Sequence, residues 1–345
     1  MNINKLTIKS VAIGASAAAC LATPSFAQET LAAVQERGNL NCQVGLPTPG
    51  FYALAEDGTW SGMDVDLCRA VSAAIFGDPD LVEYQSVTSA VRFTALANSE
   101  SDMLSRTTTW TAVRDTQLGL DFTTVNFYDG QGFLVPADSG IESALDLDGA
   151  TICVLTGTTT ELNLADYFRA NGMSFTPVTN ENVNVLVETY LGGGCDAYTN
   201  DKSGLAARRS AFPDPSSHVL LPETVSKEPL GPVVRQGDDA WANLVRWVVF
   251  GIINAEELGV TSANVDEMMA SADPNIARLL GSEGAIGEGL GVSPTFMVDV
   301  IKAVGNYGEI YEKYVGAETA IGIPREGTLN ALWTEGGIIY APPFR

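Results

Sequence analysis

Three polar segments of this 345-residue chain contain residue types that could hold a small charged molecule. The first, residues 105–114, reads SRTTTWTAVR. Hydroxyls at the alternate positions Thr107 and Thr109 point the same way if the segment is extended. The planar guanidinium of Arg114 can pair with a carboxylate through two hydrogen bonds. A threonine-rich loop with a surface arginine remains an equal interpretation.

The second segment, residues 157–161, reads GTTTE, where a strand is expected to end and a helix to begin. Free backbone N–H groups and the positive end of a helix dipole favour an anion at such a place. Thr158 and Glu161 also match the capping-box pattern, so the segment can be interpreted simply as a helix start.

The third segment ends in Asp201, just beyond a strand expected to finish at Thr199. An acid there could bind an ammonium group, although a solvated loop acid is the simpler interpretation. Phe51 and Tyr52 follow the first expected strand and its proline- and glycine-containing loop. An aromatic ring from this pair could cover a ligand side chain or pack in the core.

Together, an arginine fork, a helix N-terminus and an acid offer two partners for an anion and one for a cation. A zwitterionic α-amino acid needs this combination. The chain has a single histidine, His218, and no G-x-S-x-G sequence. Histidine-based zinc sites and Ser-His-Asp catalysis are therefore not expected, and we expect no cofactor and no metal.

The charge of the chain excludes several classes of partner. Lysine and arginine number 19, aspartate and glutamate 42, and the formal net charge is −23. A protein that neutralises phosphates needs the opposite balance, so neither nucleic acid nor an anionic membrane surface is an expected partner. The length suggests about two domains, and 46% apolar residues suffice for a sizeable core.

Residues 1–27 have the pattern of a secretory signal peptide. Two lysines precede an apolar stretch at 11–22, and 25–27 form a small-x-small cleavage site. About twelve apolar residues are too few to cross a hydrocarbon core roughly 30 Å thick. Lipidation at Cys20 is the alternative, but the bulky apolar residue expected three positions earlier is missing. We therefore expect cleavage after Ala27 and a periplasmic location.

Four cysteines follow residue 27, an even number that favours disulfides in an exported protein. Proximity in the sequence suggests the pairs Cys42–Cys68 and Cys153–Cys195. Two other connectivities and free buried cysteines remain open. No pair has the C-x2-C spacing of a structural zinc site.

The elements that must position the polar segments alternate between strands and helices, which implies parallel βαβ units and an α/β fold. Strands are expected at 40–46, 81–84, 102–106, 133–135, 151–155, 175–178 and 195–199. Helices are expected at 64–76 with Asp64 as the N-cap, and at 90–97, 158–171 and 183–191.

Two stretches, 135–140 and 225–237, resemble connections between lobes. The expected division is a signal peptide at 1–27, a discontinuous first lobe of 28–134 and 230–345, and a second lobe of 135–229. The C-terminal part is expected to be helical at 240–258, 262–270, 274–280 and 295–315. The glycine-rich stretch 281–291 fails the dinucleotide motif and is interpreted as a loop. Two connections between lobes make a hinge, and ligands commonly bind in the cleft.

Several motifs resemble those of the periplasmic solute-binding proteins that feed polar amino-acid ABC transporters, family 3 of the bacterial extracellular solute-binding proteins. The resemblance rests on residues 60–66 (WSGMDVD), 107–114, 157–161 and 198–201. Stretches 163–172, 227–232 and 254–259 are similar to the general L-amino-acid receptors, a longer subgroup. The resemblance implies the type II periplasmic-binding-protein fold: two α/β lobes joined by a two-strand hinge, with a helical C-terminal extension.

The resemblance also implies roles for individual residues. Arg114 would clamp the α-carboxylate of the ligand, and Thr109 and Thr159 would donate further hydrogen bonds to it. Thr107 and Asp201 would receive the α-ammonium group.

Three other positions complete the expected pocket. Phe51 would pack against the ligand side chain, unless Tyr52 takes that place. Arg92 would contact a side-chain carboxylate or else lie on a helix surface. Arg106 stands where relatives often have a small residue, so it could crowd or charge the rim of the pocket.

The predicted function is the periplasmic substrate-binding component of an ABC importer, which captures L-amino acids, polar or acidic and of broad range, and delivers them to the permease. We expect a monomer and no enzymatic activity. The alternative is a periplasmic dehydratase or lyase on the same scaffold, with Glu161 as a possible base. The ligand-sensing part of a receptor is a third interpretation.

Overall fold

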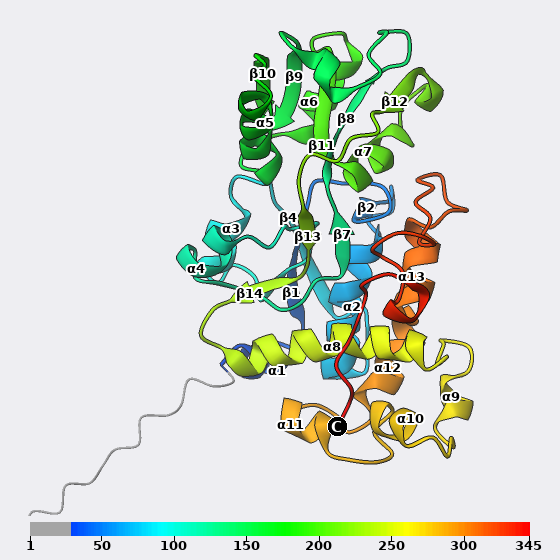
Figure 1. Cartoon of the computed structure of the whole chain (residues 1–345). Coiled ribbons are helices and arrows are strands. Elements are labelled where there is room, and N and C mark those ends of the chain that lie inside the picture. The colour runs from blue at the N-terminus through cyan, green and yellow to red at the C-terminus, as the bar shows by residue number, and fades with distance from the viewer. Residues whose placement is uncertain (1–28) are drawn as a thin grey trace, which may run out of the picture.

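The computed structural model describes residues 29–345. The predicted signal peptide, with Cys20 and the expected cleavage site, lies outside the described residues. Two lobes lie one above the other in Figure 1, and each is built on a five-stranded sheet. This arrangement confirms the expected α/β fold with two lobes.

The first lobe contains the sheet β4-β1-β5-β14-β6. Its strands are β1 (Leu40–Val44), β4 (Val82–Ser86), β5 (Met103–Leu104), β6 (Leu120–Phe122) and β14 (Val233–Arg235). β1 is parallel to β4 and β5, whereas β14 is antiparallel to β5 and β6. The other elements of this part are α1 (Glu29–Arg37), β2 (Ala53–Leu54), β3 (Trp60–Ser61), α2 (Met63–Phe76), α3 (Arg92–Ala97) and α4 (Ala112–Gln117).

The start of α2 differs from the prediction. Gly62, with φ 137°, occupies the N-cap position, and an added Cβ there would lie 2.3 Å from the carbonyl oxygen of Phe51. The expected cap, Asp64, lies inside the helix. Its carboxylate accepts hydrogen bonds from the Ser105 hydroxyl (3.1 Å) and the Thr107 backbone N–H (3.0 Å). Asp64 therefore holds the loop after β5 instead of capping its own helix.

The second lobe contains the sheet β10-β9-β11-β8-β12. Its strands are β8 (Gln131–Pro136), β9 (Thr151–Leu155), β10 (Thr176–Asn180), β11 (Ala197–Asp201) and β12 (His218–Leu220). Its helices are α5 (Thr159–Ala170), α6 (Val183–Leu191), α7 (Lys202–Arg209) and the short 3-10 turns Ala144–Leu147 and Pro215–Ser217. β9, β10 and β11 are parallel, and β8 is antiparallel to β11 and β12.

An antiparallel ribbon of β7 (Phe127–Asp129) and β13 (Glu228–Leu230) joins the two lobes. The first connection was expected after residue 134, but β8 already pairs with β11 in the second sheet. Its apolar run (Phe133, Leu134, Val135) is buried there. An apolar run predicts a strand but not the sheet that the strand joins. We propose that the lobe boundaries lie at this ribbon.

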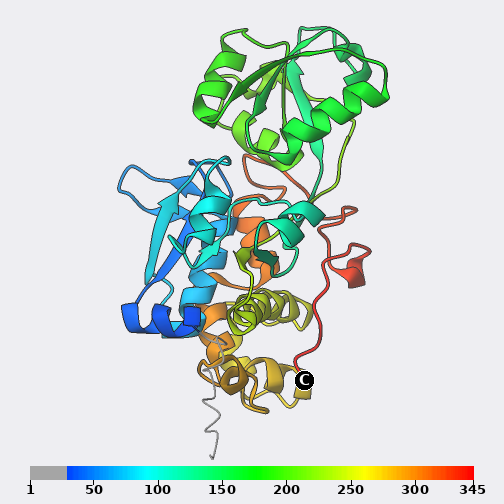
Figure 2. The same ribbon diagram turned by 90° about the vertical axis from the view of Figure 1, so that its left-hand side faces the viewer.

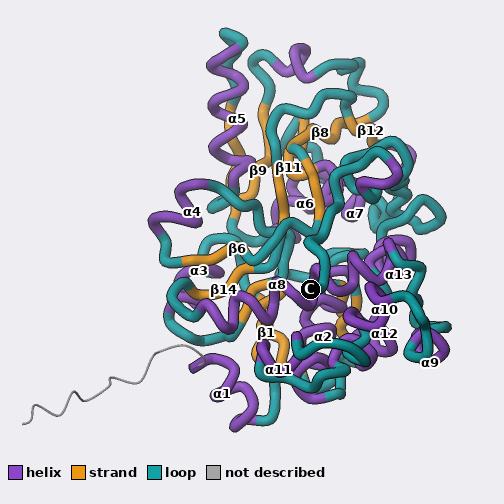
Figure 3. Tube along the Cα trace, turned by 60° about the horizontal axis from the view of Figure 1, so that its bottom comes forward, coloured by secondary structure: helices purple, strands orange, loops and turns teal. Residues whose placement is uncertain are grey.

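The yellow helices of the C-terminal part pack against the first lobe on the side away from the second (Figure 2), whereas residues 321–330 lie beside the hinge strand β7 and the second lobe. The helices of the C-terminal part are α8 (Asp239–Glu257), α9 (Val265–Met268), α10 (Pro274–Leu279), α11 (Ile286–Leu290), α12 (Phe296–Val304) and α13 (Tyr307–Tyr314), with a 3-10 turn at Trp333–Glu335. The end of the chain returns to α8 (Figure 3), where Asn254 Nδ2 donates to the carbonyl oxygen of Pro342 (2.9 Å).

Two C-terminal predictions were wrong in detail. The single helix expected at 295–315 is two helices, because Gly305 adopts φ 84° after α12 and Asn306 begins α13. Asn306 and Glu309 form a capping box there. The glycine-rich stretch expected to be a loop contains the short helix α11.

Both predicted disulfides are confirmed. Cys42–Cys68 ties β1 to α2, and Cys153–Cys195 ties β9 to the turn before β11, with Cα–Cα distances of 6.3 and 5.7 Å. The first lobe and the C-terminal helices share a large apolar core, and the first lobe has a smaller cluster around Leu104 and Phe122, whereas the second lobe has a core on each face of its sheet. Between residues 29 and 345, no helix has the length and apolar character needed to cross a membrane.

Candidate functional site

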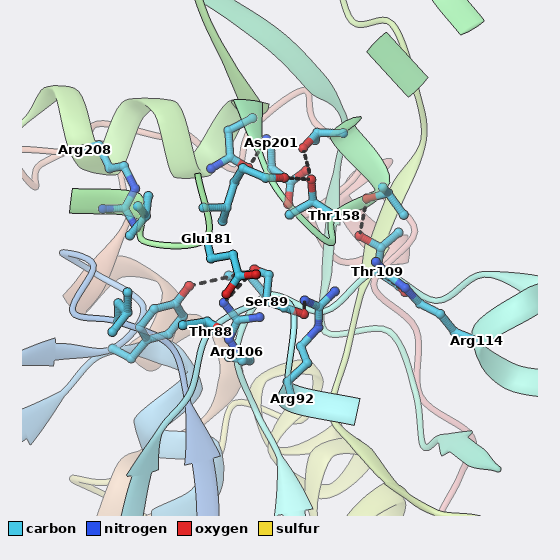
Figure 4. A pocket seen from close by; sticks show the side chains of 18 residues that line it. Thr88, Ser89, Arg92, Arg106, Thr109, Arg114, Thr158, Glu181, Asp201 and Arg208 are labelled. Atoms are coloured by element: carbon cyan, nitrogen blue, oxygen red, sulfur yellow. Dashed lines mark hydrogen bonds between the residues drawn. The ribbon is translucent and has the colours of Figure 1, made fainter. Parts of the chain in front are cut away.

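A cavity lies between the lobes, where the carboxyl ends of β5, β9, β10 and β11 meet (Figure 4). Six of the seven residues predicted for the site line this cavity: Arg92, Thr107, Thr109, Arg114, Thr159 and Asp201. The first four come from the first lobe and the last two from the second. The structure therefore brings together three polar segments that are far apart in the sequence.

The seventh residue, Phe51, lies elsewhere. Its side chain is 2% exposed and packs in the core, with its ring centroid 5.9 Å from that of Phe127. Tyr52 lines the cavity in its place, and its hydroxyl lies 3.2 Å from the hydroxyl of Thr107. Phe51 ends a tight turn whereas Tyr52 pairs with Thr48 and leads into β2, and of the two rings only that of Tyr52 lines the cavity.

Arg114 reaches the cavity from α4, a helix that the sequence analysis did not predict. Thr111 caps this helix by accepting a hydrogen bond from the Arg114 backbone N–H (3.3 Å). The guanidinium is buried, donates to the backbone carbonyl of Thr109 (2.8 Å) and lies 5.1 Å from the ring of Phe93. Burial lowers the pKa of Arg114 to about 10, and Arg114 therefore remains a cation at neutral pH.

The guanidinium of Arg92 lies over the same ring, 4.2 Å from the Phe93 centroid. It donates to the carbonyl oxygens of Ser89 and, across the cleft, of Gly157. Arg106 donates to the Ser89 hydroxyl (3.2 Å). Burial, and then the charges of Arg106 and Arg114, hold the pKa of Arg92 well below its usual value.

Arg106, Arg208 and Glu181 also line the cavity. Arg106 was identified as a departure at the pocket rim, whereas nothing in the local sequence pattern distinguished Arg208 or Glu181. The lining thus contains four arginines and only two acids, Asp201 and Glu181, in a chain whose net charge is −23. Local positive charge in an acidic protein indicates a ligand with net negative charge.

Three of these arginines have an N–H group that donates to no residue of the described chain. The Nε atoms of Arg92, Arg106 and Arg208 are buried and have no hydrogen-bond partner within residues 29–345. Buried donors of this kind are normally paired, so their presence around one cavity indicates that a ligand or water satisfies them.

Asp201 ends β11 and lies at the N-terminus of α7 without capping it. One oxygen, Oδ1, is buried and has no partner in the part of the chain that the structure describes. Burial raises the pKa of Asp201 well above its ordinary value, and the nearby carboxylates of Asp129 and Glu228 raise it further. An ammonium group would stabilise the ionised form of this carboxylate.

The hydroxyls of Thr109 and Thr159 both donate to a buried acid that the sequence analysis missed, Glu228. The distances to its Oε2 atom are 2.6 and 2.8 Å. A hydroxyl has only one proton, so both oxygens face the cavity as acceptors in this arrangement. The role expected for Thr109, donation to a ligand carboxylate, would require its proton to turn away from Glu228.

The N-terminus of α5 was correctly predicted. Thr158 is the N-cap and accepts from the Glu161 backbone N–H (3.2 Å). The Glu161 carboxylate accepts from the backbone N–H of Gly157 (2.9 Å), one residue before the position that a capping box would use. Glu161 is not among the residues that line the cavity.

Side chains from the two lobes touch across the cleft. Arg208 of the second lobe donates to the Thr48 hydroxyl of the first (2.7 Å). The hydroxyl oxygens of Thr109 and Thr159 lie 3.4 Å apart. The lobes are therefore closed on the cavity.

Comparisons with known proteins agree with this geometry. The model of the bacterial extracellular solute-binding proteins, family 3, matches residues 41–263. The chain is 51% identical over 344 residues to the general L-amino acid-binding periplasmic protein AapJ of Rhizobium johnstonii, with 99% of each chain covered. It is 50% identical over 338 residues to the glutamate/glutamine/aspartate/asparagine-binding protein BztA of Rhodobacter capsulatus, covering 98% of this chain and 99% of the relative.

A solved structure is similar over almost the whole described chain. It is an ABC transporter periplasmic binding protein from Brucella ovis with glutathione bound. The TM-score is 0.89 at 51% sequence identity, and the match covers 92% of this chain and 99% of that one. The two-lobed architecture is therefore shared with a protein that has glutathione bound.

Proposed function

We propose, since this chain belongs to family 3 of the bacterial extracellular solute-binding proteins, that it is the substrate-binding component of an ABC importer for L-amino acids. It captures the ligand between its two lobes and delivers it to the permease. We further propose that it acts in the periplasm, because similar proteins are named as periplasmic binding proteins, and that it acts as a monomer.

One observation carries the proposal. Arg114 of the first lobe and Asp201 of the second line the same cavity, and both are buried. A guanidinium and a carboxylate placed in this way match the α-carboxylate and the α-ammonium group of an amino acid. Because the two partners belong to different lobes, the ligand contacts the closed form better than the open form, which is the condition for ligand-driven closure.

The remaining charges favour acidic ligands. Arg92, Arg106 and Arg208 are available for a second carboxylate after Arg114 has bound the first. The names of the relatives include glutamate and aspartate, and glutathione also has two carboxylates and an amino group. We propose that this chain accepts polar amino acids and prefers those with a second carboxylate.

We propose a binding protein without enzymatic activity. The dehydratase or lyase alternative needs a base at the ligand, and the residue considered for that role, Glu161, binds the backbone of Gly157 outside the cavity. The relatives near 50% identity are named as binding proteins.

The test is calorimetric titration of the mature protein, unfolded and refolded to remove bound ligand, with the twenty L-amino acids. We expect tight binding of several polar and acidic amino acids without turnover. Arg114→Ala and Asp201→Ala should each weaken binding by at least about 100-fold, since each removes a buried charge-assisted contact. Arg169→Ala, which alters an exposed arginine on α5, is the matched control.

Circular dichroism must show that both variants are folded. Unchanged affinity in either folded variant would contradict the assignment of the site. Consumption of a bound amino acid by the wild type would favour the enzyme.

A further inference from the structure

Glu228 is a buried carboxylate at the start of the hinge strand β13, with 1% of its surface exposed. Its four hydrogen-bond donors come from three parts of the chain. Oε2 accepts from the hydroxyls of Thr109 and Thr159 at 2.6 and 2.8 Å. Oε1 accepts from Asn163 Nδ2 at 2.7 Å and from the Ser226 hydroxyl at 2.6 Å.

These donors belong to both lobes. Thr109 follows β5 in the first lobe, whereas Thr159 and Asn163 lie in the first two turns of α5 in the second. A single carboxylate on the hinge therefore bonds the two walls of the ligand cleft to each other. Ionised acceptors form the stronger class of hydrogen bond, particularly where water is excluded.

The backbone around Glu228 shows which bonds opening would break. The N–H of Trp110 donates to the Pro229 carbonyl (2.8 Å), and the N–H of Gly231 donates to the Thr108 carbonyl (3.1 Å). The hinge strand is thus attached to the loop that carries Thr109 and moves with the first lobe. The bonds from Glu228 to α5 are those that are lost when the second lobe swings away.

Resting on the proposed function, we propose that Glu228 is a positioning residue that latches the closed form. It does not touch the ligand. It holds α5 and its N-terminus against Arg114 and Thr109, and it thereby sets how long the loaded protein stays closed. Asn163 is the second-lobe arm of this latch and can be changed without altering the cavity lining, to which it does not belong.

The test replaces the hydrogen-bond donor on α5 with a second carboxylate. Asn163→Asp places a carboxylate where the amide now donates to Glu228, so two negative charges face each other between α5 and β13. We expect the dissociation rate of the best-bound amino acid to rise by about tenfold or more, with the association rate changed much less. Adding Glu228→Gln in the same chain gives the new carboxylate at position 163 an amide donor. The dissociation rate should then return to within a few fold of the wild type.

Stopped-flow fluorescence gives the two rates, and energy transfer between dyes on the two lobes gives the closed fraction without ligand. Asn171→Asp is the matched control, because it makes the same charge change on the exposed end of α5 and should leave both readouts unchanged. A role in folding stability alone would not change the closed fraction.

Two results would overturn the latch. One is an Asn163→Asp protein that dissociates its ligand at the wild-type rate. The other is an accelerated rate that Glu228→Gln does not correct. Failure of the proposed function is distinguishable from both, because the wild type itself would then bind none of the amino acids.

Discussion

At the scale of residues, the cavity is defined by buried charges whose partners are incomplete. Arg106 is 8% exposed, its guanidinium donates to the Ser89 hydroxyl (3.2 Å), and its Nε has no partner within the described chain. Arg92 has a similar unpaired Nε beside it. Such donors contribute binding energy only to a ligand that brings an acceptor, preferably a carboxylate. They are therefore candidates for selecting between acidic and neutral amino acids.

Arg106→Ala should weaken binding of L-glutamate about tenfold more than binding of L-glutamine, because only glutamate loses a charge-assisted contact. The measurement is a pair of calorimetric titrations with the two ligands on the wild type and the variant. An equal loss for both would mean that Arg106 shapes the cavity but does not recognise the second carboxylate.

At the scale of elements, helix ends position the chemistry in both lobes. Thr158 caps α5 beside the cavity, and Thr111 caps α4, the helix that carries Arg114. The same device separates α12 from α13 in the C-terminal part. There Asn306 is 5% exposed, accepts from the Glu309 N–H (2.9 Å) and donates to the Val260 carbonyl (2.9 Å). This residue therefore stabilises the start of a separate helix, α13, directly after the end of α12.

Asn306→Ala should lower the free energy of unfolding by about 1–2 kcal/mol, since it removes an N-cap and leaves a buried carbonyl without its donor. Urea denaturation followed by circular dichroism measures this change. Asn184→Ala, on the exposed face of α6, is the control and should be close to neutral. A neutral Asn306→Ala would show that helix packing alone determines the break.

At the scale of the whole molecule, the hinge ribbon and the second sheet bring together three acids from separate elements: Asp129 on β7, Asp201 on β11 and Glu228 on β13. Burial raises the pKa of Asp129 to about 6 and that of Asp201 well above its ordinary value, while Arg114 and Arg92 act in the opposite direction on Asp201. The cluster exists only because the hinge ribbon and the second sheet meet at the cleft. Its protonation is therefore linked to ligand binding.

Ligand binding favours the deprotonated form of Asp201. The ligand ammonium stabilises the ionised form of Asp201 and lowers its pKa, so binding releases a proton wherever the free site is protonated. Affinity should rise with pH between the lowered pKa of the liganded site and the raised pKa of the free site, and level off above the latter. The limit is about tenfold per pH unit for each proton released.

Calorimetry at pH 6 in two buffers of different ionisation heat counts the released protons. Asp129→Asn removes a neighbouring negative charge and should move the affinity profile to lower pH. Affinity that is independent of pH between 5 and 7, with no proton released, would exclude this linkage.

Local sequence patterns were sufficient to predict much of the secondary structure and part of the site. The residue order by itself predicted the alternation of strands and helices, the α5 cap at Thr158 and the two disulfides, all of which the structure confirms. Turn chemistry, capping and periodicity act within a few residues, so they can be read along the chain. The same local reasoning singled out the segments that supply five residues of one cavity, because strand ends and helix starts are where such sites form, and the family resemblance added Arg92.

Tertiary structure decided the rest. Three features depend on contacts between segments distant in the sequence: the placement of β8 in the second sheet, the choice of Tyr52 over Phe51, and the presence of Arg208 in the cavity. Asp64 and Glu228 show this most clearly. Asp64 was expected only to cap a helix and Glu228 was missed, yet each accepts hydrogen bonds from residues more than 40 positions away. A buried carboxylate must find donors wherever the fold brings them, and only the assembled molecule determines which donors those are.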